Sequence, residues 1–94
     1  MSTKVNRLEG KVAIVTGAGQ GIGAAIAEAY AGEGARVILT GRTLSKVEEI
    51  AAKINAAGGE AIPLEALAGD LEQSRKTVDR ALSEWGRIDA LVNN

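Results

Sequence analysis

The sequence contains no cysteine and no histidine, and of its 94 residues only Tyr30 and Trp85 are aromatic. The absence of cysteine excludes disulfides and thiol chemistry, and the absence of histidine excludes imidazole acid–base catalysis and the usual zinc sites. Two aromatic side chains are too few for a platform on which single-stranded nucleic acid could stack. We therefore expect neither a metal site nor a nucleic-acid partner.

An excess of charge of one sign is also lacking, because 11 basic residues stand against 12 acidic ones and the net charge is −1. This balance gives no electrostatic reason to bind nucleic acid or an anionic membrane. No apolar run is long enough to span a bilayer, and the first ten residues lack the apolar centre of a signal peptide. With 46% hydrophobic and 24% charged residues, the composition predicts one small globular domain, which we expect in the cytoplasm.

Glycine, by contrast, is concentrated in one stretch, Thr-Gly-Ala-Gly-Gln-Gly-Ile-Gly at residues 16–23. The apolar residues 11–16 favour a buried strand, and the strong helix formers at 21–31 favour a helix. Backbone N–H groups and the dipole at the start of a helix attract phosphate, and residues without a Cβ let the phosphate approach. The stretch therefore predicts a phosphate-binding loop.

The spacing of this stretch is T-G-x-x-x-G-x-G, from Thr16, Gly17, Gly21 and Gly23. The dinucleotide fingerprint G-x-G-x-x-G is not matched from Gly17, because Ile22 stands where its third glycine would be. A Walker A loop is excluded, because no Gly-Lys-Ser/Thr sequence follows. The alternative interpretation is a glycine-rich turn that only packs a helix on a sheet.

Strands and helices alternate along the chain. We expect strands at 11–16, 35–40, 60–65 and 88–92, and helices at 21–31, 44–57 and 71–85. The alternation predicts right-handed βαβ units and a partial Rossmann-type, doubly wound α/β fold with a parallel sheet of order 3-2-1-4. Pro63 suits an edge strand, since proline cannot donate to the ladder, and the fourth strand forms the opposite, uncovered edge. Residues 1–94 are expected to be a single truncated dinucleotide-binding domain, with 1–9 as a flexible segment from which only Leu8 docks.

Two of the predicted helices carry signals at their start. Ser45 and Glu48 resemble a capping box, and Asp70 is a favourable N-cap for the third helix. The third helix is expected to face the core through a stripe of Leu71, Val78, Leu82 and Trp85.

Two runs of the sequence resemble the short-chain dehydrogenase/reductase family. Leu-Glu-Gly-Lys-Val-Ala-Ile-Val-Thr-Gly at 8–17, followed by Gly-Ile-Gly at 21–23, is similar to the opening of that family. Gly-Arg-Ile-Asp-Ala-Leu-Val-Asn-Asn at 86–94 is similar to the run that leads into its Asn-Asn-Ala-Gly motif. The resemblance implies an oxidoreductase that transfers hydride between a nicotinamide cofactor and a carbonyl or alcohol.

The resemblance also implies which residues contact the cofactor. Its pyrophosphate would be bound by Gly17, Gln20, Gly21 and Ile22. Asn93 would lie beside its ribose. At the place where members of the family carry an Asp that meets adenine, this chain has Leu67, and Asp70 matches the later helix-capping acid.

The family's catalytic Ser and its Tyr-x-x-x-Lys pair have no counterpart in these residues. Tyr30, the single tyrosine, is followed four residues later by Gly34 and not by a lysine. We therefore assign no catalytic residue and expect the 94 residues alone to be inactive.

The end of the second predicted strand indicates which dinucleotide binds. NAD sites usually place an acid there to accept hydrogen bonds from the ribose hydroxyls, but no Asp or Glu occurs between Gly34 and Glu48. Arg42 stands there instead, and a guanidinium binds a 2′-phosphate as a fork. The pattern favours NADP(H) over NAD(H), with Gly41 leaving room for the phosphate. The alternative is that Arg42 is a solvated loop residue.

Two further functions compete with this interpretation. The chain could be a non-catalytic fragment, natural or engineered, that binds nucleotide weakly or not at all and forms homo-oligomers through the exposed edge of its fourth strand. Gly17, Gly19 and Gly21 also spell the G-x-G-x-G of an S-adenosylmethionine methyltransferase. Such a site also requires an acid after the second strand, so this interpretation ranks last.

Overall fold

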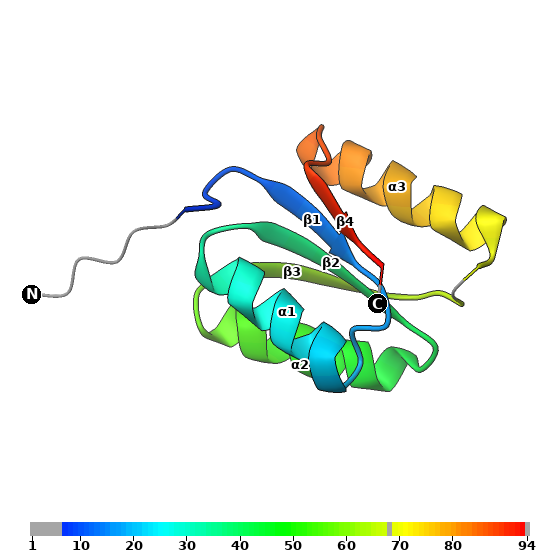
Figure 1. Ribbon diagram of the computed structural model, residues 1–94, viewed down its shortest axis with the longest axis horizontal. Helices are drawn as coiled ribbons and strands as arrows, with labels where there is room; N and C mark the ends of the chain where they lie inside the picture. Colours follow the sequence, from blue (N-terminus) through cyan, green and yellow to red (C-terminus); the bar gives the residue numbers. More distant parts are fainter. Residues whose placement is uncertain (1–6, 68, 94) are drawn as a thin grey trace, which may run out of the picture.

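The computed structural model describes residues 7–67 and 69–93 and shows a four-stranded sheet between two layers of helices (Figure 1). Its elements in chain order are β1 (Val12–Val15), α1 (Gly21–Gly32), β2 (Arg36–Gly41), α2 (Leu44–Ala56), β3 (Glu60–Glu65), α3 (Leu71–Trp85) and β4 (Ala90–Val92). All neighbouring strands pair in parallel, in the order β3-β2-β1-β4. The predicted fold class and strand order are therefore confirmed.

The two central strands, β1 and β2, are apolar on both faces because helices cover both faces of the sheet. Val12 and Ile14 belong to the core cluster packed against α3, whereas Val15, Val37 and Leu39 belong to the cluster packed against α1 and α2. In Figure 1, α1 and α2 lie on one side of the sheet and α3 lies on the other. Parallel strands that are buried on both faces have continuous apolar sequences. These strands can therefore be predicted from the sequence.

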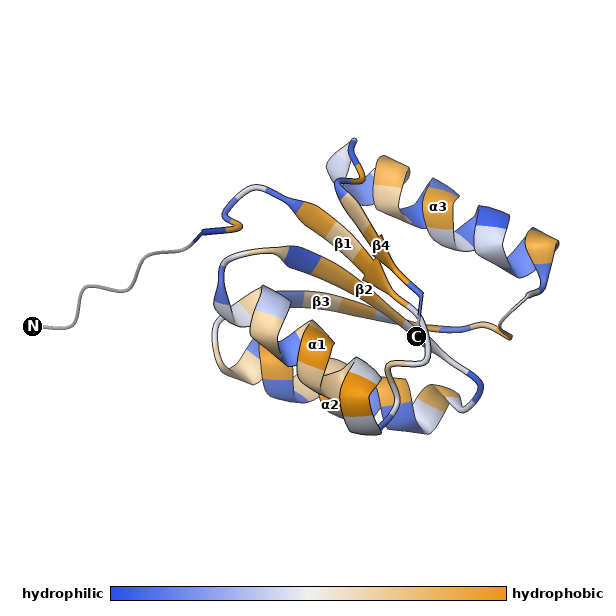
Figure 2. Ribbon diagram, viewed as in Figure 1, coloured by the Kyte–Doolittle hydropathy of each residue, from blue (hydrophilic) through white to orange (hydrophobic). Residues whose placement is uncertain are grey.

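The predicted core stripe of α3 is wrong in three of its four residues. Leu71, Val78 and Leu82 are 86%, 39% and 47% exposed, while Thr77 and Ala81 are buried. Trp85 alone of the stripe packs against the core. Small side chains let the helix approach the sheet closely, and the buried Thr77 hydroxyl is satisfied by the Gln73 carbonyl at 3.0 Å. Figure 2 shows the resulting mixture of apolar and charged residues along α3.

The helix starts are partly as predicted. Asp70 is confirmed as the N-cap of α3, because its Oδ1 accepts a hydrogen bond from the Gln73 N–H at 3.0 Å. The capping box on α2 is wrong, because the helix begins at Leu44 and places Ser45 inside its first turn. The N-cap is Thr43, whose side chain makes no capping hydrogen bond.

The two edges of the sheet are β3 and β4. Pro63 lies in β3 opposite Leu39, as expected for an edge strand. On the other edge, β4 is only three residues long, and Leu91 is 64% exposed. The predicted flexible segment 1–9 lies outside the described residues except for 7–9, where the Leu8 N–H donates to the Glu33 carbonyl at 2.8 Å and its side chain packs on the core.

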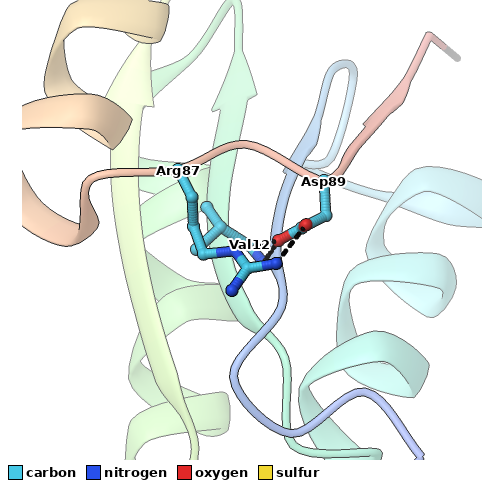
Figure 3. Close-up of polar contacts among 3 residues, drawn as sticks. All are labelled: Val12, Arg87 and Asp89. Carbon is cyan, nitrogen blue, oxygen red and sulfur yellow. Dashed lines mark hydrogen bonds and ion pairs between the residues drawn. The ribbon is translucent and has the colours of Figure 1, made fainter.

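An ion pair and a backbone contact hold the start of β4 against β1 (Figure 3). Asp89 Oδ2 accepts a hydrogen bond from the Val12 N–H at 2.8 Å, and the Asp89 N–H donates to the Val12 carbonyl at 2.8 Å. Arg87 binds both carboxylate oxygens of Asp89, at 2.7 and 2.9 Å. The bond from Arg87, and then that from Val12, lowers the pKa of Asp89. These contacts set the register in which β4 runs toward the candidate site.

Candidate cofactor-binding site

The glycine-rich loop connects β1 to α1 at the carboxyl edge of the sheet. It is tied to the neighbouring strand, because the N–H of the buried Ala18 donates to the Thr40 carbonyl at 2.9 Å. Gly17 and Gly21 both have φ of 62°, in the left-handed region that favours glycine. The loop thus holds a defined shape at the point where α1 begins.

The first turn of α2 packs directly against this loop. A Cβ on Gly19 would lie 3.2 Å from the Lys46 Cβ, and a Cβ on Gly41 would lie 2.8 Å from the Val47 Cγ1. The room that Gly41 leaves is therefore filled by Val47, which corrects the expectation that it is left for a phosphate. The two glycines instead bring α2 and the loop together.

The start of α1 is open to an anion. Its N-cap, Gln20, is extended and makes no side-chain capping bond, and the first turn contains no acidic residue. Ile22, in that turn, is 72% exposed. The N–H groups at the beginning of a helix and the helix dipole favour negative charge. Within the described residues, no carboxylate occupies this position.

Two basic side chains border the loop on the side of β2. Arg42 is exposed and directly follows β2. Lys46, in the first turn of α2, donates a hydrogen bond from Nζ to Gln20 Oε1 at 3.1 Å. Sequence analysis missed Lys46, because it considered this helix only for its apolar spacing and its start signal. The sequence did contain a signal for it, because Lys46 lies four residues after Arg42 and close to the same strand end.

Asn93 lies on the opposite side of the loop, immediately after β4. The Thr16 hydroxyl is 3.1 Å from Asn93 Oδ1 and 3.3 Å from the Val92 carbonyl, so its one proton is donated to one of them at a time. The Thr16 N–H donates to the Val92 carbonyl at 3.0 Å. Because the chain leaves β1 toward β2 on one side and β4 lies on the other, this is the topological switch point where α/β sheets bind ligands.

The end of β3 contributes differently from the other strand ends. Leu67 is 48% exposed, and its N–H donates to the side-chain oxygen of Gln73. Asp70 is engaged in capping α3. This part of the site therefore presents an apolar side chain, with Asp70 committed to the helix.

The structure thus brings the residues predicted to bind cofactor to one edge of the sheet. They are Gly17, Gln20, Gly21, Ile22, Arg42 and Asn93. A hollow of about 630 Å³ lies at the other end of the strands, where β2 and β3 begin. Four of its charged residues form two ion pairs, Lys53 with Glu28 at 3.3 Å and Arg36 with Glu60 at 3.4 Å. These four charges are therefore already compensated within the chain.

A doubly wound α/β domain with a glycine-rich loop at its switch point belongs to the Rossmann-type class of nucleotide-binding proteins. The sequence model of the short chain dehydrogenase family matches residues 11–94. The chain belongs to this family, whose members use nicotinamide dinucleotide cofactors. It corresponds to the N-terminal part of the family's fold.

Relatives agree with this assignment. An uncharacterized oxidoreductase of Methylorubrum extorquens is 45% identical over 91 residues, which are 96% of this chain and 37% of that protein. A probable tetrahydroxynaphthalene reductase of Zymoseptoria tritici is 40% identical over 90 residues, 95% of this chain and 34% of that protein. The chain thus spans little more than a third of the length of these relatives.

Solved structures show the same likeness. A hydroxysteroid dehydrogenase from Escherichia coli superposes with a TM-score of 0.91 at 36% identity, over 95% of this chain and 38% of that one. A citronellol catabolism dehydrogenase from Pseudomonas aeruginosa gives 0.90 at 36% identity, over 98% and 38%. No helix in the described parts of the chain is long and apolar enough to cross a membrane.

Proposed function

We propose that this chain binds NADP(H) and forms the cofactor-binding part of a short chain dehydrogenase that interconverts a carbonyl and an alcohol. The observation that supports it best is the glycine-rich loop, shaped by two left-handed glycines and open at the start of α1. Hydride transfer is the chemistry that the nicotinamide supplies when bound. The loop amides and the helix dipole would stabilise the negatively charged diphosphate.

We assign each predicted residue to one group of the cofactor. The four loop residues Gly17, Gln20, Gly21 and Ile22 would surround the diphosphate. Asn93, beside the Thr16 hydroxyl, would face the ribose. The sequence has no Tyr-x-x-x-Lys pair, so we assign these residues to cofactor binding and not to catalysis. Assays of carbonyl reduction by the 94-residue chain should detect no turnover.

The preference for NADP(H) rests on the charge at the end of β2. Within the described residues Arg42 makes no ion pair, and no acid lies between Gly34 and Glu48 in the sequence. A carboxylate there would repel a 2′-phosphate, whereas the guanidinium binds it through charge-assisted bonds. Such a bond contributes about 1.5–3 kcal/mol net, which is about a ten- to a hundredfold difference in affinity.

The preference is tested by calorimetric titration of the chain with NADP⁺ and NAD⁺. We expect NADP⁺ to bind about tenfold or more tightly than NAD⁺, and Arg42→Ala to weaken NADP⁺ binding about tenfold while its NAD⁺ affinity stays the same. Arg75→Ala removes an equal charge from an exposed position on α3 and should leave the preference intact. Equal affinities in the original chain, unchanged in Arg42→Ala, would refute it.

A second candidate function is self-association. It is favoured by β4, an edge strand whose Leu91 is 64% exposed, and by the exposed Val78 and Leu82 on α3. An unpaired ladder beside apolar side chains can pair with a second copy of the chain. Under this proposal the chain forms homo-oligomers and binds nucleotide weakly.

The proposal also places the protein in the cytoplasm, as its composition predicts. A protein that uses a dissociable nicotinamide coenzyme works in a compartment that contains this coenzyme. Fractionation of cells that express the tagged protein would check the location, and recovery outside the cytoplasm would refute it.

A further inference from the structure

Lys46 is a basic side chain at the candidate site that has no part in the proposal so far. It is the third residue of α2, whose first turn is in contact with the loop at Gly19. Its Nζ donates a hydrogen bond to Gln20 Oε1 at 3.1 Å. The ammonium group is therefore held at the glycine-rich loop although its own backbone belongs to another element.

The charge of Lys46 is not neutralised by a carboxylate within the described residues. Its partner there is the neutral amide of Gln20, whereas Lys53, at the other end of the same helix, lies 3.3 Å from a carboxylate oxygen of Glu28. Arg42 likewise makes no ion pair in the described chain. Two uncompensated cations on one side of the loop attract an anion to that side.

The position of Lys46 distinguishes between the anionic groups of a dinucleotide. The amides at the start of α1 suit the diphosphate, because they are the free N–H groups at the N-terminus of the helix that follows β1. Arg42 and Lys46 both follow β2 and are four residues apart in the sequence. They therefore lie on the side of the glycine-rich loop against which α2 packs. A phosphate monoester is a stronger acceptor for an ammonium group than a neutral amide is.

We infer that Lys46 is a second specificity-determining residue, which together with Arg42 binds the adenosine 2′-phosphate of NADP(H). The inference rests on the proposed function, because it assumes that the dinucleotide occupies this edge of the sheet. The hydrogen bond to Gln20 keeps the ammonium beside the loop when no nucleotide is bound, which reduces the conformational entropy lost on binding.

The test uses two nucleotides that differ by one group, adenosine 2′,5′-bisphosphate and adenosine 5′-monophosphate. Their affinities for the 94-residue chain are measured by calorimetry or by NMR titration. Lys46→Gln should weaken bisphosphate binding about tenfold and leave monophosphate binding unchanged. Lys46→Arg should retain the bisphosphate affinity, and the loss in Lys46→Gln should shrink at high salt, which screens exposed charges.

Lys53→Gln is the matched control, because it removes the same charge from the other end of α2. It should bind both nucleotides as the original chain does. If Lys46→Gln binds the bisphosphate normally while Arg42→Ala does not, the inference is wrong and the proposed NADP(H) preference stands. Equal weakening of both nucleotides by Lys46→Gln would place Lys46 at another phosphate and also overturn it. If the original chain does not prefer the bisphosphate, or binds neither nucleotide, the proposed preference itself fails and the inference fails with it.

Discussion

At the scale of single residues, four glycines at the candidate site have two different structural roles. Gly17 and Gly21 adopt left-handed conformations that shape the loop. Gly19 and Gly41 leave space for side chains of α2, as the distance of 2.8 Å from a Cβ on Gly41 to the Val47 Cγ1 shows. The strand–loop–helix order predicted a phosphate-binding loop at the first pair of glycines. The room at Gly41 was attributed to the ligand, because a contact between separate elements is not visible in the sequence.

Asp89 is the residue with a clear consequence for the pH dependence of stability. Its carboxylate binds Arg87 and the Val12 N–H, and both bonds lower its pKa in the folded chain. A carboxyl group with a lowered folded pKa stabilises the fold above its unfolded pKa of about 3.9. This contribution is lost as the pH falls through the lower, folded value.

Urea unfolding of the original chain and of Asp89→Asn would test this at a series of pH values. We expect the variant to be less stable at pH 7, and the difference in unfolding free energy to shrink as the pH falls below about 4. Asp79→Asn, on the exposed side of α3, controls for the change in net charge. A difference in stability that stays constant from pH 7 to pH 2 would contradict the assigned role.

At the scale of elements, α3 shows how packing overrides periodicity. The leucines of this helix suggest one buried stripe, but the structure buries Thr77 and Ala81, with Trp85 partly buried, each four residues from the next. A helix residue is buried where the opposing surface accepts it, and the α3 face of the sheet already carries bulky residues such as Ile14 and Ile38. Small side chains on the helix complement them.

Substitutions at two neighbouring residues test whether Ala81 or Leu82 faces the core. Ala81→Leu adds volume at a position that is 0% exposed and should lower the free energy of unfolding by about 1–3 kcal/mol. Leu82→Gln changes a side chain that is 47% exposed and should change it by about 0.5 kcal/mol or less. Denaturant unfolding would measure both. The reverse order of effects would mean that Leu82, as part of the predicted stripe, faces the core.

At the scale of the whole molecule, the sheet is covered unevenly. Helices cover both faces along β1 and β2, but Leu91 of the edge strand β4 is 64% exposed, and α3 also carries exposed apolar residues. Figure 2 shows apolar residues on both β4 and α3. A strand of three residues offers few ladder groups to a partner. Apolar contact, more than backbone pairing, would therefore drive association at this edge.

Sedimentation over a range of concentrations would test self-association. We expect the 94-residue chain to form dimers or larger species, and Leu91→Lys to raise the dissociation constant about tenfold or more, since it places a charge in the apolar contact. Leu44→Lys, at a position 38% exposed on α2, should have no such effect. A stable monomer at high concentration would count against the second candidate function.

Much of the fold was determined by the sequence alone, because its signals are local. Apolar runs and glycine-rich turns predict the order of the elements, right-handed βαβ units predict a parallel sheet, and doubly wound topology places its strands in the order 3-2-1-4. Pro63 and Asp70 were assigned correctly for the same reason, since their effects depend on their own backbone and their nearest neighbours.

Tertiary structure alone decided which residues meet. The contact of Lys46 with Gln20 and the packing of α3 on the sheet join segments distant in the chain, and the packing of Val47 at Gly41 joins two separate elements. The capping box at Ser45 failed because α2 begins at Leu44, the predicted start, which puts Ser45 inside the first turn and makes Thr43 the N-cap. The physical reason is that side-chain contacts depend on the distances between elements, which follow from the packing of the whole core and from no single stretch of sequence.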